Sequence, residues 1–88
     1  MTYKEGNNLA ISVLRFSLDS GEIQDFLILK EFKACGLDVI AIYPCDEYLV
    51  AYENAEYEFL YKDNESNVIF SDGKLYQMLY GEFRKTLQ

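Results

Sequence analysis

The most constraining feature of the sequence is a strict alternation of side-chain types over residues 56–61. Alternate positions are aromatic, and the positions between them are mostly acidic: Tyr57, Phe59 and Tyr61 against Glu56, Glu58 and Leu60. Because successive side chains of a β-strand point to opposite faces of a sheet, the pattern predicts a strand with one core-facing aromatic face and one solvated face.

Further strands are predicted around this one. In chain order, the expected strands of the central region are 38–43, 48–53, 56–61 and 68–70. The first two are joined by a turn at 44–46, which contains the only proline. Residues 54–55 give a two-residue connection, since asparagine tolerates a positive φ. With a polar loop at 62–67, these segments predict an antiparallel meander.

The N-terminal half is compatible with two structures. Residues 9–18 fit both strand and helix spacing, and we favour a strand that ends in a turn at 19–21. Residues 22–35 favour a helix, with apolar residues on a broad face and Gly36 at the usual left-handed stop. The alternative is a second strand that pairs with 9–18 as a hairpin, with only 30–35 helical.

The C-terminal segment predicts a helix over residues 73–86, with Ser71 or Asp72 as its cap. Its apolar side chains recur at helical spacing: Leu75, Tyr76, Leu79, Tyr80 and Phe83. The predicted fold is therefore a single small α+β domain over 1–88. It is an antiparallel β-meander of three to five strands covered on one face by two helices.

The negative charge is confined to the middle of the chain. The protein carries 15 acidic and 8 basic residues, a net charge of −7. Residues 38–65 hold eight of the acids, opposed only by Lys62, so this segment accounts for the whole imbalance. Glu56 and Glu58 would lie about 6.6 Å apart along a strand, and Glu53 would face Glu56 across the hairpin, where like charges repel. Exposed acids also serve solubility alone, which is the plainer interpretation.

Composition and motifs argue against catalysis. The chain has no histidine, the usual general base and commonest metal ligand. Cys35 and Cys45 are too few for a zinc site and are expected to be reduced packing residues. Residues 63–67 begin like a calcium loop, but Val68 and Lys74 stand where glycine and glutamate are required. We expect no enzyme activity, no catalytic residue, no metal and no cofactor.

A cytoplasmic location is expected, without membrane association. The N-terminal residues lack the basic start and apolar stretch of a signal peptide. Uninterrupted apolar runs such as Phe26–Leu29 are far shorter than the ~20 residues that cross a bilayer.

The expected function is that of a non-enzymatic, protein-binding inhibitor. A pI near 4.4 opposes direct nucleic-acid binding, but regularly spaced carboxylates present a phosphate-like pattern to the basic surface of a nucleic-acid-binding enzyme or complex. The predicted partner-binding residues are Asp46, Glu47, Tyr48, Tyr52, Glu53, Glu56, Glu58, Asp63 and Glu65.

In size, charge and composition alone, the chain resembles the small acidic inhibitors of phages and mobile elements, such as anti-CRISPR proteins and other DNA mimics. These proteins share no motif, so the resemblance assigns no residue. The alternative is a small accessory or regulatory domain that acts through homo- or hetero-oligomerisation, for instance as a homodimer.

Overall fold

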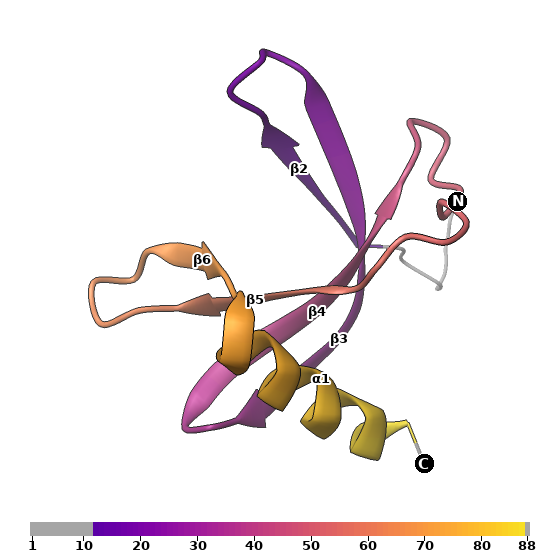
Figure 1. Cartoon of the computed structure of the whole chain (residues 1–88). Coiled ribbons are helices and arrows are strands. Elements are labelled where there is room, and N and C mark those ends of the chain that lie inside the picture. Colours follow the sequence, from indigo (N-terminus) through magenta and orange to yellow (C-terminus); the bar gives the residue numbers. More distant parts are fainter. Residues whose placement is uncertain (1–11, 88) are drawn as a thin grey trace, which may run out of the picture.

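A computed structural model describes residues 12–87 of the chain. In this part of the protein, five strands are followed by one helix (Figure 1). The elements are β2 (Val13–Ser17), β3 (Ile23–Ala34), β4 (Leu37–Cys45), β5 (Glu58–Lys62), β6 (Val68–Phe70) and α1 (Gly73–Thr86). None of residues 12–87 belongs to a helix long and apolar enough to cross a membrane.

The strands form one antiparallel sheet in the order β2-β3-β4-β5-β6. Each strand therefore pairs with the next one in the sequence, but the predicted meander is wrong at its centre, because it placed a strand at 48–53 between β4 and β5. The sheet is strongly curled (Figure 1). Phe16 on β2 and Phe70 on β6 belong to its two outermost strands, yet their ring centroids are only 5.2 Å apart.

The prediction of two helices covering the sheet is wrong. Within residues 12–87 the only helix is α1, and the segment predicted as a helix at 22–35 is strand β3. The hairpin alternative is correct for the pairing of β2 with β3, although residues 30–34 are also strand rather than helix. Of the predicted strand 9–18, residues 13–17 form β2, and residues 9–11 lie outside the described part.

A β-bulge explains why β3 does not look like a strand in the sequence. The register with β4 shifts between Ile28, which faces Ile42, and Lys30, which faces Ala41. Phe26 therefore packs on one face of the sheet, whereas Phe32 packs on the other although both numbers are even. This change of phase breaks the period-2 pattern by which a strand is recognised.

The left-handed conformation predicted for Gly36 is confirmed, but the residue follows a strand and not the predicted helix. Cys35 and Gly36 have φ values of 54° and 74°, and Ala34 pairs with Leu37. Two consecutive positive φ angles between paired strands are typical of a type I′ hairpin turn. The glycine therefore ends a strand, not a helix.

Apolar side chains pack on both faces of the sheet. On the face covered by α1, the buried residues are Ala34, Val39, Ala41, Phe59, Leu79 and Phe83. On the opposite, inner face of the curl they are Phe26, Ile42 and Leu60. The predicted core-facing side of the strand at 56–61 is confirmed by the buried Phe59, although β5 begins only at Glu58. The predicted solvated side is wrong, because Leu60 is also buried, on the opposite face of the sheet.

Helix α1 has the predicted bounds. Asp72 is its N-cap residue, but the carboxylate makes no capping hydrogen bond within the described residues. At the other end, Lys30 Nζ donates to the carbonyl of Thr86 at 3.1 Å, where the helix dipole favours a cation. The lysine reaches this helix end because it directly follows the bulge in β3.

The strand predicted at 48–53 does not form. Only one isolated bridge, between Cys45 and Ala51, occurs there, and β4 pairs directly with β5. The turn predicted at 44–46 is also wrong, since Pro44 and Cys45 belong to β4. Residues 46–57 form a long connection, which we call the β4–β5 loop.

Candidate protein-interaction site

The β4–β5 loop carries most of the residues predicted to bind a partner. Asp46, Glu47, Tyr48, Tyr52, Glu53 and Glu56 lie within it, and Glu58 is the first residue of β5. Glu53 and Glu56 do not face each other across paired strands, so the predicted repulsion across a hairpin ladder is wrong.

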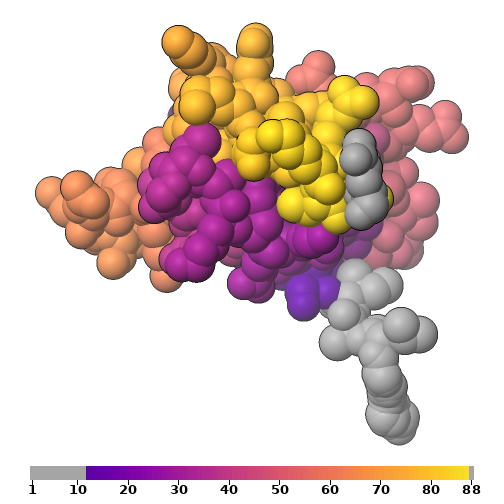
Figure 2. Space-filling model, turned by 90° about the horizontal axis from the view of Figure 1, so that it is seen from below, coloured from indigo at the N-terminus to yellow at the C-terminus, as the bar shows by residue number. Residues whose placement is uncertain are grey.

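Asp63 and Glu65 are in a different place. They lie in the turn between β5 and β6, beyond the far end of β5 from Glu58. At ~3.3 Å per residue, Asp63 is about 16 Å along the chain from Glu58. The β4–β5 loop and the β5–β6 turn project from opposite ends of the molecule in two perpendicular views (Figures 1 and 2). The nine predicted residues therefore form two groups, of seven and of two.

Asp46 organises the first half of the loop. Its Oδ1 accepts hydrogen bonds from the backbone N–H groups of Tyr48 at 2.8 Å and Val50 at 2.9 Å. The backbone N–H of Leu49 donates to the Asp46 carbonyl at 3.0 Å, and the N–H of Asp46 donates to the Val50 carbonyl at 2.9 Å. Asparagine and aspartate favour such local side-chain-to-backbone bonds, which compete with sheet pairing. Asp46 therefore shapes the loop rather than offering a free carboxylate.

Tyr43 holds the second half of the loop. Its hydroxyl donates to the carbonyl of Tyr52 at 2.7 Å and accepts from the N–H of Ala55 at 3.2 Å. The N–H of Tyr52 in turn donates to the carbonyl of Pro44 at 3.1 Å. At the end of the loop, the Tyr76 hydroxyl of α1 donates to the carbonyl of Tyr57 at 2.7 Å.

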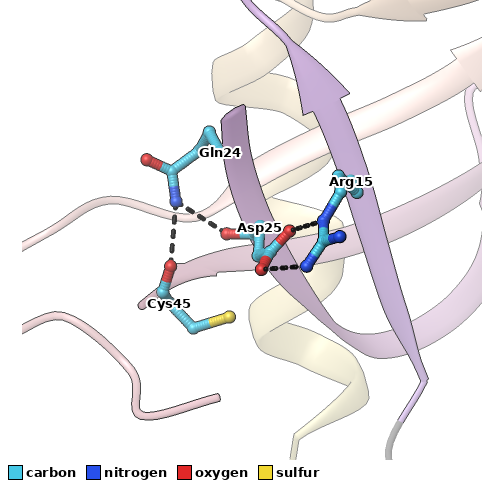
Figure 3. Close-up of polar contacts among 4 residues, drawn as sticks. All are labelled: Arg15, Gln24, Asp25 and Cys45. Carbon is cyan, nitrogen blue, oxygen red and sulfur yellow. Dashed lines mark hydrogen bonds and ion pairs between the residues drawn. The ribbon is translucent and has the colours of Figure 1, made fainter. Parts of the chain in front are cut away.

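The start of the loop is fixed by a polar network on β2, β3 and β4 (Figure 3). Gln24 Nε2 donates to the carbonyl of Cys45 at 3.0 Å and to that of Asp25 at 2.7 Å. The buried Asp25 carboxylate accepts from Arg15 Nε at 2.8 Å and Nη2 at 3.2 Å. The hydrogen bond with Arg15 lowers the pKa of Asp25, because it favours the charged form more than burial disfavours it.

Large side chains project from the loop into solvent. Their exposed fractions are 78% for Tyr48, 60% for Val50, 44% for Tyr52 and 39% for Leu49. The acidic side chains of Glu47, Glu53 and Glu56 are exposed as well. The loop contains no lysine or arginine. It therefore combines an apolar tip, residues 48–50, with exposed carboxylates on both sides of it in the sequence.

Glu58, at the start of β5, has a raised pKa. Its side chain is partly buried. Burial raises its pKa, and the negative charge of Glu56 raises it further. A cation placed beside these two side chains would favour the charged form of Glu58 and so oppose both effects.

The β5–β6 turn repeats the backbone of the loop tip with polar residues. Asp63 Oδ1 accepts from the N–H groups of Glu65 at 2.8 Å and Asn67 at 2.9 Å. These hydrogen bonds, the one from Asn67 first, lower the pKa of Asp63. Leu49 and Ser66, the fourth residue of each turn, both have a φ of 66°. The carboxylate of Asp63, like that of Asp46, is engaged by its own turn.

A groove of about 470 Å³ lies elsewhere on the sheet but is balanced in charge. The apolar side chains of Ile40 and Leu60 contribute to its wall. Its charged lining residues are two of each sign: Glu31, Asp38, Lys33 and Lys62. The groove therefore does not share the one-sided charge of the loop.

The two cysteines differ in exposure. Cys45 is buried, as predicted, and burial raises the pKa of its thiol, with smaller contributions from Asp25 and Asp46. A raised pKa disfavours the reactive thiolate. Cys35 is exposed in the β3–β4 turn, contrary to the prediction of a packing residue. Among residues 12–87, no three histidine, cysteine, aspartate or glutamate side chains are grouped so that they could hold a metal ion.

Sequence reasoning missed the residues that position the site. Leu49 and Val50 were assigned to a strand, and Tyr43 and Gln24 received no role. The available signal was the aspartate at the start of each turn, because Asp46 and Asp63 both precede four residues that their carboxylates then organise.

Comparisons with known proteins give no relative: no family model, no curated protein and no solved structure matches the chain.

Proposed function

We propose that this protein is a non-enzymatic binding domain that docks its β4–β5 loop onto a basic surface of another protein and blocks that surface. The observation that carries the proposal is the charge of residues 46–58. This segment holds five carboxylates and no lysine or arginine. Three of these side chains, Glu47, Glu53 and Glu56, are exposed on a loop whose backbone is held by hydrogen bonds.

Electrostatic complementarity gives the proposal its physical basis. Charged surfaces of opposite sign steer association and exclude wrong partners, and the effect weakens as salt screens the charges. A surface rich in lysine and arginine is also the kind that grips nucleic-acid phosphates. The domain would therefore compete with nucleic acid for its partner.

The test is capture from cell extract by the tagged protein and by two matched variants. The first variant, Glu47→Lys/Glu53→Lys/Glu56→Lys, reverses the loop. The second, Asp19→Lys/Glu22→Lys/Glu31→Lys, makes the same change in net charge at exposed positions outside the loop.

A specific partner is expected to be retained by the wild type and the second variant and lost by the first. Its binding is expected to fall steeply with ionic strength and to be displaced by duplex DNA. Equal loss with both variants would show an effect of net charge alone and would contradict the proposal.

Self-association is the second candidate function. Val68 and Phe70 on the short edge strand β6 are 53% and 40% exposed, so an apolar edge is available. A dimer would then persist at high salt, because burial of apolar surface does not depend on ionic attraction. Light scattering at low and high ionic strength distinguishes it from the acidic docking surface.

A further inference from the structure

We infer that the loop tip, Tyr48-Leu49-Val50, inserts into an apolar pocket of the partner whose rim carries lysine or arginine. The inference rests on the proposed function and adds a second kind of contact to it. The acidic side chains would set the orientation of the partner, and the tip would supply the contact that excludes water.

The exposure of the tip is the first observation. Its three consecutive side chains are at least 39% exposed, and Tyr52 two positions later is 44% exposed. Single exposed apolar residues are common on soluble proteins, whereas a contiguous group marks an interaction surface. No other run of three consecutive large apolar side chains is exposed within residues 12–87.

The second observation is that the turn does not require these residues. The β5–β6 turn has the same set of hydrogen bonds, made by Asp63 instead of Asp46, and it is built from polar residues. Leu49 occupies the left-handed position that Ser66 occupies there, a conformation that glycine and asparagine adopt more readily than leucine. Formation of the turn therefore does not explain the apolar side chains at the tip.

The charge around the tip indicates which kind of partner it can bind. Glu47 and Glu53 flank it on either side in the sequence, and both are exposed. A second copy of this chain, with a net charge of −7, is a poor match, and so is an anionic membrane. A protein pocket with lysine or arginine at its rim pairs with the flanking carboxylates. An arginine there also stacks on Tyr48 or Tyr52.

The test uses three end-capped tripeptides that imitate parts of such a pocket: Arg-Trp-Arg, Arg-Gly-Arg and Glu-Trp-Glu. Each is titrated into the full-length ¹⁵N-labelled protein, and amide chemical shifts are followed by NMR. The β5–β6 turn serves as an internal control, because it has the same backbone and an exposed Glu65 but no apolar side chain at its tip.

Arg-Trp-Arg is expected to shift the amide signals of residues 47–52 and to leave those of 64–67 nearly unchanged. Leu49→Asn and Tyr48→Ser are each expected to weaken this binding about fivefold or more, as loss of a buried apolar contact predicts. Asparagine is chosen at position 49 because it tolerates the positive φ. An unchanged urea midpoint in each variant would exclude unfolding as the cause.

Equal shifts with Arg-Gly-Arg, or equal responses of the two turns, would overturn the inference and leave the proposed electrostatic docking intact. Equal binding of Glu-Trp-Glu at the tip would instead contradict the basic partner, and with it the proposed function. Binding of Arg-Trp-Arg that is unaffected by both tip variants would also overturn the inference.

Discussion

Removal of the Tyr43 hydroxyl tests whether the β4–β5 loop is held in place before it meets a partner. Tyr43→Phe keeps the ring, which packs edge-on against Tyr57 with centroids 5.3 Å apart. It deletes the hydrogen bond to the Tyr52 carbonyl at 2.7 Å and the one from the Ala55 N–H at 3.2 Å. Each neutral hydrogen bond contributes about 1 kcal/mol net. We therefore expect the free energy of unfolding to fall by about 1–2 kcal/mol.

The assays are urea unfolding and amide hydrogen exchange. For a domain of this size, a loss of 1 kcal/mol lowers Tm by roughly 4–8 °C. The Ala55 amide is expected to exchange faster in the variant, because its hydrogen-bond acceptor is gone. Tyr76→Phe is the matched control: it removes the bond to the Tyr57 carbonyl and lowers stability, but leaves exchange at Ala55 unchanged. Wild-type stability together with wild-type exchange at Ala55 in Tyr43→Phe would refute the reasoning.

Three further predictions concern the core and the titrating acids. Phe59→Ala is expected to lower the free energy of unfolding by about 3–5 kcal/mol, since Phe59 is fully buried between the sheet and α1. A loss of less than about 1 kcal/mol, measured by urea unfolding, would contradict the packing. Glu58→Gln is expected to stabilise the fold at neutral pH. Burial, and then the charge of Glu56, raise the pKa of Glu58 above its ordinary value of 4.5, so the folded state binds this proton more tightly than the unfolded state does. The stability of the wild type therefore falls as the pH rises from 4.5 through the pKa of the folded state. A stability–pH curve of the variant parallel to that of the wild type would contradict this. Asp63→Asn is expected to destabilise the fold at neutral pH, and the difference in stability from the wild type is expected to vanish in acid. The reason is that the lowered pKa of Asp63 contributes stability that is present above pH 3.8 and is lost as the pH falls through the pKa of the folded state. Urea unfolding between neutral and strongly acidic pH checks it, and a difference that persists in acid would count against it.

The sequence predicts those elements whose side-chain period is uninterrupted. The alternation around Phe59 and the helical spacing of Leu79 and Phe83 each have a single phase. The helix forms with the predicted bounds, and the strand forms over Glu58–Lys62 instead of 56–61. Strand β3 was missed as the main prediction because the bulge after Ile28 moves the later side chains to the other face. Within these 12 residues, apolar side chains point first to one face of the sheet and then to the other, so their spacing in the sequence resembles that of a helix.

The loop tip was mispredicted for a different reason. Tyr48 and Val50 favour a strand by propensity, but the Asp46 carboxylate binds their N–H groups and prevents sheet pairing. The equivalent turn at Asp63 was correctly expected to be a loop, because its residues are polar. Local hydrogen bonds to an aspartate thus determine the structure of both turns. Only the turn at Asp63 has the polar composition from which a loop is predicted.

Zero-length cross-linking of a purified complex tests the central claim most directly. A carbodiimide joins a carboxylate to a lysine amine only when the two are in contact, so it reports which acids meet the partner. Mass spectrometry is expected to find links from Glu47, Glu53 or Glu56 to partner lysines. Links confined to Asp19, Glu22, Glu31 or Glu65 would place the contact elsewhere and would contradict the account.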